Sequence, residues 1–294
     1  MRLLALVAVV LFASPVGAAD LESRIAPLAK DHKGKVAVAV KHLKTGEEFY
    51  LNADEAMPTA SLIKLPIMVE TYWQVEEKKL KLDTKLTLTK DDKVQGSGIL
   101  TPNFSDGATF PLKDAVRLMI VFSDNTATNM VLDQIGLPAT NARMEKLGFK
   151  NTKINAKVFK PETRIDQEFG KKYGLGSTTA KEMVQLLELM DAGKVVSPEA
   201  CKEMLGHLKA CDDKEKIVRF LPTGTVVAHK TGSVNASKTD AGIIYTKSGP
   251  VALCVLTDGN TDQRWVIDNA AQVLIGKIAR EVYEHFEGKK DEKK

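Results

Sequence analysis

The stretch Thr59-Ala-Ser-Leu-Ile-Lys-Leu-Pro-Ile, residues 59–67, places a serine and a lysine three positions apart before an apolar run. If a helix begins near Ser61, Ser61 and Lys64 share one face of it. A serine hydroxyl needs a base beside it to act as a nucleophile, and a partly desolvated lysine amine can be that base. The start of a helix also favours the negative charge that develops on the oxygen. The pair thus permits an activated nucleophile, although alone it is more typical of a capped helix with an exposed lysine.

A second stretch, Phe-Ser-Asp-Asn-Thr-Ala at residues 122–127, lies between two predicted helices. A loop at that junction can present Ser123 and Asn125 to a groove. The alternative is a purely structural role, because Ser, Asp and Asn all cap helices well.

A third stretch, His-Lys-Thr-Gly-Ser at residues 229–233, follows a β-rich segment. Lys230 and Thr231 lie on the predicted strand, and Gly232 leaves room for a ligand to approach the backbone. An ordinary edge strand that leads into a turn is the alternative interpretation.

Hydrophobic periodicity predicts strands near both chain ends and helices between them. The simplest architecture is one antiparallel sheet built from both ends and covered by the terminal helices, with an all-helical lobe in the middle. The groove between sheet and lobe is the natural place for a site. We expect strands at residues 35–41, 47–51, 85–89, 226–229, 239–245 and 251–257, and helices at 21–30, from 61, and at 112–122, 127–135, 139–147, 178–190, 198–209 and 265–286.

Residues 1–19 read as a signal peptide, with one basic residue, a short apolar run, a proline and small residues before a cleavage site after Ala18 or Ala19. An uncleaved membrane anchor is the alternative, but the apolar run is short for a span. We therefore expect a periplasmic or secreted protein without stable membrane insertion. The 294-residue chain has a net charge of only +4, with scattered basic residues, so no nucleic-acid partner is expected.

The three cysteines, Cys201, Cys211 and Cys254, leave at least one thiol unpaired within the chain. Cys201 and Cys211 lie on one predicted helix, too far apart along its axis to form a disulfide. Cys254 falls in an apolar strand pattern and is expected to be a buried small hydrophobe. Nothing in the sequence resembles a metal site, and no cofactor is expected.

The three stretches, in this order, resemble the motifs of the penicillin-recognising serine enzymes and, within them, the class A β-lactamases. The resemblance runs from about Leu21 to Phe286. It is carried further by Gly96-Ser-Gly-Ile-Leu, Gly148-Phe, Ser177-Thr-Thr-Ala, Val227-Ala-His-Lys-Thr-Gly and Asp240-Ala-Gly-Ile-Ile.

That family implies an α/β (α+β) fold, with an antiparallel five-stranded sheet flanked by helices and an additional all-helical lobe. Residues 20–60 and 205–294 would form the α/β domain. Residues 61–204 would form the helical domain, which carries the nucleophile helix and the Ser-Asp-Asn loop.

The resemblance also implies catalytic roles. Ser61 would attack a β-lactam carbonyl and form an acyl-enzyme, with Lys64 as its activating partner. Ser123 would pass a proton to the departing lactam nitrogen, and Lys230 would tune Ser123 and attract the substrate carboxylate.

Substrate binding would use residues of the same three stretches. Asn125 would hold the amide side chain of the substrate, and Thr231 would contact its carboxylate. The backbone N–H groups of Ser61 and Ser233 would form an oxyanion hole, in which each donor is often worth ~3 kcal/mol of transition-state stabilisation. Gly232, which has no side chain, would leave room for the substrate beside the strand. A cationic site suits the anionic β-lactam as the single small-molecule partner.

Deacylation in class A enzymes needs a loop glutamate followed by an apolar residue and an asparagine. Residues 161–166, Pro-Glu-Thr-Arg-Ile-Asp, offer Glu162 as the base and Ile165 as the apolar residue, but Asp166 replaces the asparagine. Two close carboxylates raise one pKa, so the pair would share a proton or position water poorly.

A second departure concerns the arginine that binds the substrate carboxylate. The strand position that often carries it is Ala241 here. Arg219, on the segment before the Lys-Thr-Gly strand, and Lys238 are the candidate replacements, although surface ion pairs would explain both residues as well.

The leading hypothesis is an exported, monomeric serine β-lactamase of the class A type. The alternative is a related serine hydrolase that turns over β-lactams poorly, such as a D-alanyl-D-alanine peptidase or another amide or ester hydrolase. A non-catalytic binding protein on the same fold is disfavoured, because a site without catalytic activity would not need Ser61, Lys64, Ser123 and Lys230 together.

Overall fold

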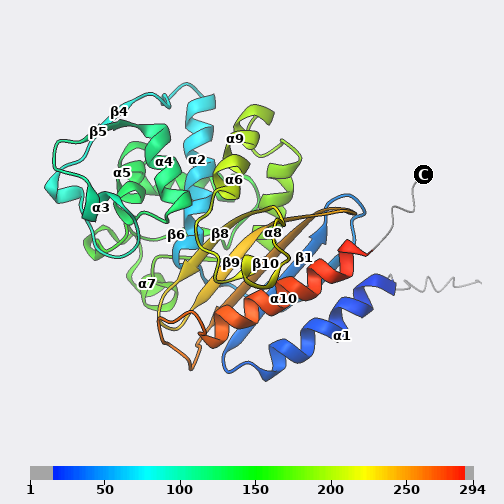
Figure 1. Ribbon diagram of the computed structural model, residues 1–294. Helices are drawn as coiled ribbons and strands as arrows, with labels where there is room; N and C mark the ends of the chain where they lie inside the picture. Colours follow the sequence, from blue (N-terminus) through cyan, green and yellow to red (C-terminus); the bar gives the residue numbers. More distant parts are fainter. Residues whose placement is uncertain (1–15, 289–294) are drawn as a thin grey trace, which may run out of the picture.

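A five-stranded antiparallel sheet forms the centre of the molecule, seen in a computed structural model that describes residues 16–288 (Figure 1). The strand order β2-β1-β10-β9-β8 brings the two ends of the chain together in one sheet, as the sequence predicts. The strands are β1 (Lys35–His42), β2 (Glu48–Leu51), β8 (Val227–Ser233), β9 (Lys238–Thr246) and β10 (Gly249–Asp258).

Helices cover both faces of this sheet, so its strands are buried on two sides. Helices α1 (Val16–Asp31) and α10 (Ala270–Glu287) lie side by side on one face, and α8 (Ala180–Asp191) packs on the other (Figure 1). In β1, Val36, Val38 and Val40 belong to the core beneath the terminal helices, whereas Ala37 and Ala39 belong to the core shared with the helical part. This alternation follows from the two-residue period of a strand.

The helical part lies beside the sheet and carries small two- and three-stranded elements at its margins (Figure 1). Its helices pack around the apolar α2, which is buried over most of its length. The elements are β3 (Met57–Pro58), α2 (Lys64–Glu76), β4 (Lys85–Thr87), α3 (Leu100–Asn103), β5 (Thr109–Pro111), α4 (Leu112–Val121), α5 (Asn125–Ile135), α6 (Leu137–Lys146), β6 (Lys153–Ile154), α7 (Gln167–Tyr173), β7 (Gly176–Thr178) and α9 (Pro198–Lys209).

The predicted fold class is confirmed, and three predicted helix starts are wrong, the first because α1 begins at Val16 and not at residue 21. Ser61 does not open an α-helix but lies in a 3₁₀ turn, η1 (Ala60–Ile63), and α2 begins only at Lys64. The last helix begins at Ala270 rather than near residue 265, because the Asn269 side chain caps it by accepting from the N–H groups of its first turn. The predicted signal peptide falls mostly on residues 1–15, which lie outside the described residues.

All three cysteines are free and buried. Cys254 lies on β10 with no exposed surface, as predicted, and Cys211 lies beyond the end of α9 rather than on the helix of Cys201. Within residues 16–288, no helix combines the length and the apolar character needed to cross a membrane.

The turn η1 is fixed against strands β8 and β9 by a close approach at Gly232. A Cβ atom on Gly232 would lie 2.5 Å from the carbonyl oxygen of Thr59 and 2.9 Å from the N–H nitrogen of Leu62. The Thr239 hydroxyl donates to the same Thr59 carbonyl at 2.9 Å. Gly232 is therefore required because any side chain would push the strand away from the turn that carries Ser61.

We predict that Gly232→Ala lowers the free energy of unfolding by about 1–3 kcal/mol, the usual cost of overpacking. Chemical denaturation measures this change. Gly206→Ala is the matched control, since nothing lies within 4 Å of a Cβ at that exposed position of α9, and alanine favours a helix. Equal stability of Gly232→Ala and the parent protein would contradict the close approach.

Candidate active site

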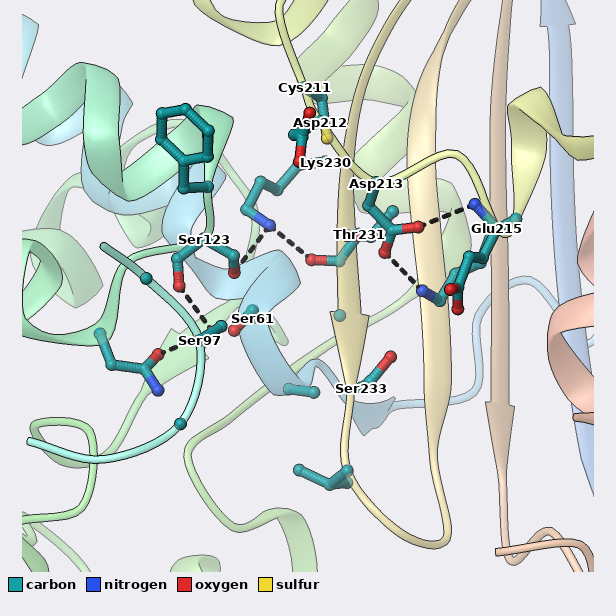
Figure 2. A pocket seen from close by; sticks show the side chains of 18 of the residues that line it. Ser61, Ser97, Ser123, Cys211, Asp212, Asp213, Glu215, Lys230, Thr231 and Ser233 are labelled. Atoms are coloured by element: carbon teal, nitrogen blue, oxygen red, sulfur yellow. Dashed lines mark hydrogen bonds and ion pairs between the residues drawn. The ribbon is translucent and has the colours of Figure 1, made fainter. Parts of the chain in front are cut away.

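A cavity of about 1070 Å³ opens where η1, the loop before α5 and strand β8 meet. Its lining includes Ser61, Ser123, Asn125, Lys230, Thr231, Gly232 and Ser233. Figure 2 shows Ser61, Ser123, Lys230, Thr231 and Ser233 around the same space. The structure thus brings together all three motifs that the sequence singles out, from segments far apart in the chain.

Lys64 is fully buried, and its ammonium donates three hydrogen bonds to the loop before α5. The acceptors are the Ser123 carbonyl at 2.6 Å, the Ser123 hydroxyl at 3.2 Å and the Asn125 side-chain oxygen at 2.8 Å. Burial, and then the nearby Lys230 charge, lower the pKa of Lys64 well below the usual lysine value. An amine with a lowered pKa can accept a proton, and the hydroxyl that Lys64 bonds is that of Ser123, whereas the sequence predicts Ser61 as the hydroxyl that Lys64 activates.

Ser123 occupies a strained backbone conformation that the following helix stabilises. Its φ of +53° is uncommon for a residue with a side chain, and such strain concentrates at functional sites. Next to it, Asp124 caps α5 by accepting from Ala127 N–H at 2.8 Å, and its other oxygen accepts from the N–H groups of Ile99 and Leu100. Asp124 therefore fixes the loop from two sides while Ser123 faces the cavity.

Lys230 approaches the same hydroxyl from the sheet. Its ammonium donates to the Ser123 hydroxyl at 3.1 Å and to the Thr231 carbonyl at 2.7 Å (Figure 2). Burial lowers the pKa of Lys230, although the Cys211 and Asp213 groups oppose this. One serine hydroxyl thus lies between two buried amines, which is an arrangement suited to relaying a proton.

The cavity wall behind Lys230 is the segment 211–216, which the sequence analysis did not single out. A buried ion pair behind β8 anchors it: Asp240 accepts from the Ile217 N–H at 3.0 Å and lies 3.1 Å from the His229 ring nitrogen. Burial alone would lower the pKa of His229, but the Asp240 carboxylate raises it to about 10. The opposite charges of Asp213 and Lys216, three apart, were the sequence signal available for this wall.

The family model for the beta-lactamase enzyme family matches residues 20–286 of this chain. The chain belongs to this family. The extended-spectrum β-lactamase PER-1 of Pseudomonas aeruginosa is 25% identical over 92% of this chain and 88% of its own length. A β-lactamase of Bacillus licheniformis is 27% identical, over 81% of this chain and 76% of that protein.

Solved structures agree. A β-lactamase from Sphaerobacter thermophilus superposes with a TM-score of 0.77 at 29% identity, covering 90% of this chain and 95% of that one. A mutant of PBP-A with glutamate in place of a leucine, solved as an acyl-enzyme complex with penicillin G, gives 0.80 at 25% identity, covering 92% and 97%. Membership of the β-lactamase family supports a hydrolase activity of that type for this chain.

Glu162 does not line the cavity, contrary to the position that the β-lactamase resemblance predicts for it. The Asn129 side chain of α5 accepts from Val158 N–H at 2.8 Å and donates to the Val158 carbonyl at 2.9 Å. These bonds turn Val158 and Phe159 towards the cavity, and leave Glu162 exposed in a 3₁₀ turn.

Asp166 is likewise exposed and outside the cavity lining, and it has a structural role. Its side chain caps α7 by accepting from Phe169 N–H at 3.0 Å. The Asn155 amide bonds both the N–H and the carbonyl of Asp166, at 2.9 Å each. The structure therefore does not bring Glu162 and Asp166 together around a water site, and Ile165 beside them is also exposed.

The two candidate cations for the substrate carboxylate also lie elsewhere. Arg219 is not among the lining residues and bonds the Asp268 carboxylate and the carbonyl of Ile267, which does line the cavity. Lys238 is buried, donates to the Val234 carbonyl at 2.6 Å and lies over the Trp265 ring. Besides Lys230, the cavity is lined by Lys214 and Lys216, and sequence reasoning missed Lys216 because a lysine side chain is rarely expected to be fully buried.

We predict that Lys64→Met, which keeps the side-chain volume but cannot accept a proton, slows acylation by benzylpenicillin by about 10²–10⁴-fold. Stopped-flow absorbance of the lactam measures the rate. Lys113→Met on an exposed position of α4 should react as the parent protein does. A Lys64→Met rate within a factor of two of the parent would remove Lys64 from the chemistry.

Proposed function

We propose that the protein is a serine hydrolase that opens the β-lactam amide through an acyl-enzyme on Ser61, and that this acyl-enzyme is long-lived. The observation that supports the first half is the Ser123 hydroxyl held between the buried amines of Lys64 and Lys230 at the edge of the Ser61 cavity. The observation that supports the second half is the outward position of Glu162.

Acylation follows from the groups that line the cavity. The Ser61 oxygen attacks the lactam carbonyl as its proton leaves towards the neutral amine of Lys64. The negative charge that develops on the carbonyl oxygen is met by the N–H groups of Ser61 and Ser233. The C–N bond then breaks, the Ser123 hydroxyl donates its proton to the departing nitrogen, and the Lys64 ammonium passes the proton taken from Ser61 to the Ser123 oxygen, which Lys230 also contacts.

Hydrolysis of the acyl-enzyme ester on Ser61 needs a second base, which activates a water molecule on the other side of the ester. In this cavity the loop between β6 and α7 contributes the apolar side chains of Val158 and Phe159, and no carboxylate. The acids that do line the cavity, Asp212, Asp213 and Glu215, lie on the wall behind Lys230, so we propose that deacylation is the slow step.

The same observation favours a second candidate, a peptidase of the D-alanyl-D-alanine type. Such an enzyme can pass the acyl group from the same serine to the amine of a second peptide, and this transfer needs no activated water at the position of Val158. The name PBP-A belongs to one of the structures that this chain resembles, at 25% identity.

We predict that mass spectrometry detects a benzylpenicillin adduct on Ser61 within seconds and that most of it persists after an hour. Ser61→Ala should give no adduct, and Glu162→Gln should leave the lifetime unchanged. Val158→Glu, which brings a carboxylate into the cavity, should shorten the lifetime at least about tenfold, since a general base commonly contributes about 10²–10⁴. Rapid turnover by the parent protein that Glu162→Gln stops would contradict the proposal and restore Glu162 to the mechanism.

We also propose that the protein is exported, because residues 1–19 contain the apolar run of a signal peptide. We propose further that it is a monomer of the class A type. Expressed with its own leader in a Gram-negative host, the protein should be released with the periplasmic fraction. Its N-terminal residue should then be Ala19 or Asp20. An intact Met1 in the membrane fraction would contradict cleavage.

A further inference from the structure

Charged groups on the cavity wall balance one another, although an anionic substrate would favour a net positive site. The charged lining residues are Asp212, Asp213, Lys214, Glu215, Lys216 and Lys230, three acids against three bases. One of the acids makes specific contacts with the groups that a substrate carboxylate would need.

The Asp213 carboxylate lies between strand β8 and Lys216. One oxygen accepts from the Lys216 ammonium at 2.7 Å and the other accepts from Glu215 N–H at 2.9 Å, and the Thr231 side chain lies beside the same carboxylate. Figure 2 shows Asp213 beside Thr231 on the strand side of the cavity. The Lys216 charge holds the pKa of Asp213 below its usual range despite burial, so the group is an anion at neutral pH.

Asp213 therefore pairs with one of the groups that would otherwise bind a substrate carboxylate there and lies beside the other. The Thr231 hydroxyl is the donor expected to contact that carboxylate, and Lys216 is a cation on this wall. A second carboxylate at this place would meet a like charge, and such a juxtaposition costs several kcal/mol across an interface.

We propose that Asp213 sets the substrate specificity of this site, which takes acyl donors with a neutral hydrogen-bond donor, such as a carboxamide or hydroxyl, where β-lactams carry a carboxylate. A carboxamide N–H or a hydroxyl can donate to the Asp213 oxygens, and a carboxylate cannot. This inference rests on the proposed acylation of Ser61 and names the substrate class that the site accepts best.

The test uses three forms of benzylpenicillin that differ only at this group: the carboxylate, the carboxamide and the methyl ester. The first-order rates of Ser61 adduct formation are compared by mass spectrometry for the parent protein, Asp213→Asn and Asp212→Asn. Asp212→Asn is the matched control, because it removes the same charge from an exposed side chain of the same wall. The methyl ester is neutral but has no hydrogen-bond donor. It therefore separates two effects: a hydrogen bond from the substrate to Asp213, and relief of the repulsion between Asp213 and a substrate carboxylate.

In the parent protein, the carboxamide should react fastest, then the ester, then the carboxylate. Asp213→Asn should raise the carboxylate rate relative to the carboxamide rate by about tenfold or more, whereas Asp212→Asn should leave the ratio as it is. A parent protein that reacts tenfold faster with the carboxylate overturns the inference whether or not Asp213→Asn folds.

A ratio shifted equally by both variants would assign the effect to the general charge of the wall and would also overturn the role of Asp213. If the carboxylate form acylates Ser61 fastest, the proposed function is supported and the inference about Asp213 is wrong. Absence of any adduct with all three compounds overturns the proposed function, and the inference with it.

Discussion

The Ser123 hydroxyl accepts from two fully buried lysines, and the rest of the site depends on that shared contact. Lys64 reaches it from the helical part and Lys230 reaches it from the sheet. Two buried ammonium groups around one oxygen repel each other, and burial disfavours the charge of each. The fold therefore lowers the pKa of both lysines, which favours the release of a proton by one of them.

Residues that take no part in the proposed chemistry hold the Lys64–Ser123–Lys230 contact in place. Asp124 fixes the loop that carries Ser123, and Gly98 leaves room for it, since a Cβ there would lie 2.4 Å from the Asp124 carboxylate. Gly232 lets η1 approach β8, so Ser61 and the strand share one cavity wall. These positions contact no reacting atom, yet each limits how far the two halves of the site can separate.

The fold and the acylation half of the site could be predicted because they depend on local signals. Alternating valines and alanines indicate the sheet, and Ser61, Lys64, Ser123 and Lys230 stand in short motifs with fixed geometry. Glu162 was misplaced because the position of a loop residue depends on a distant contact: Asn129 bonds the Val158 backbone and so decides which side chains face the cavity. Lys216 was missed for a different reason: Asp213, three residues away, was the available signal, but opposite charges at this spacing are common on exposed surfaces and do not indicate a buried lysine.

The central claim is that the buried site lowers the pKa of Lys64 well below the usual lysine value, and a titration of Lys64 tests this most directly. Protein labelled with ¹³C at the lysine Cε can be titrated by NMR, with the Lys64 signal assigned from its absence in Lys64→Met. The account predicts that this signal titrates well below the usual lysine value of about 10.4, while signals of exposed lysines do not. A Lys64 signal that titrates with the exposed lysines would mean that the amine stays charged and that Ser61 is activated by another group.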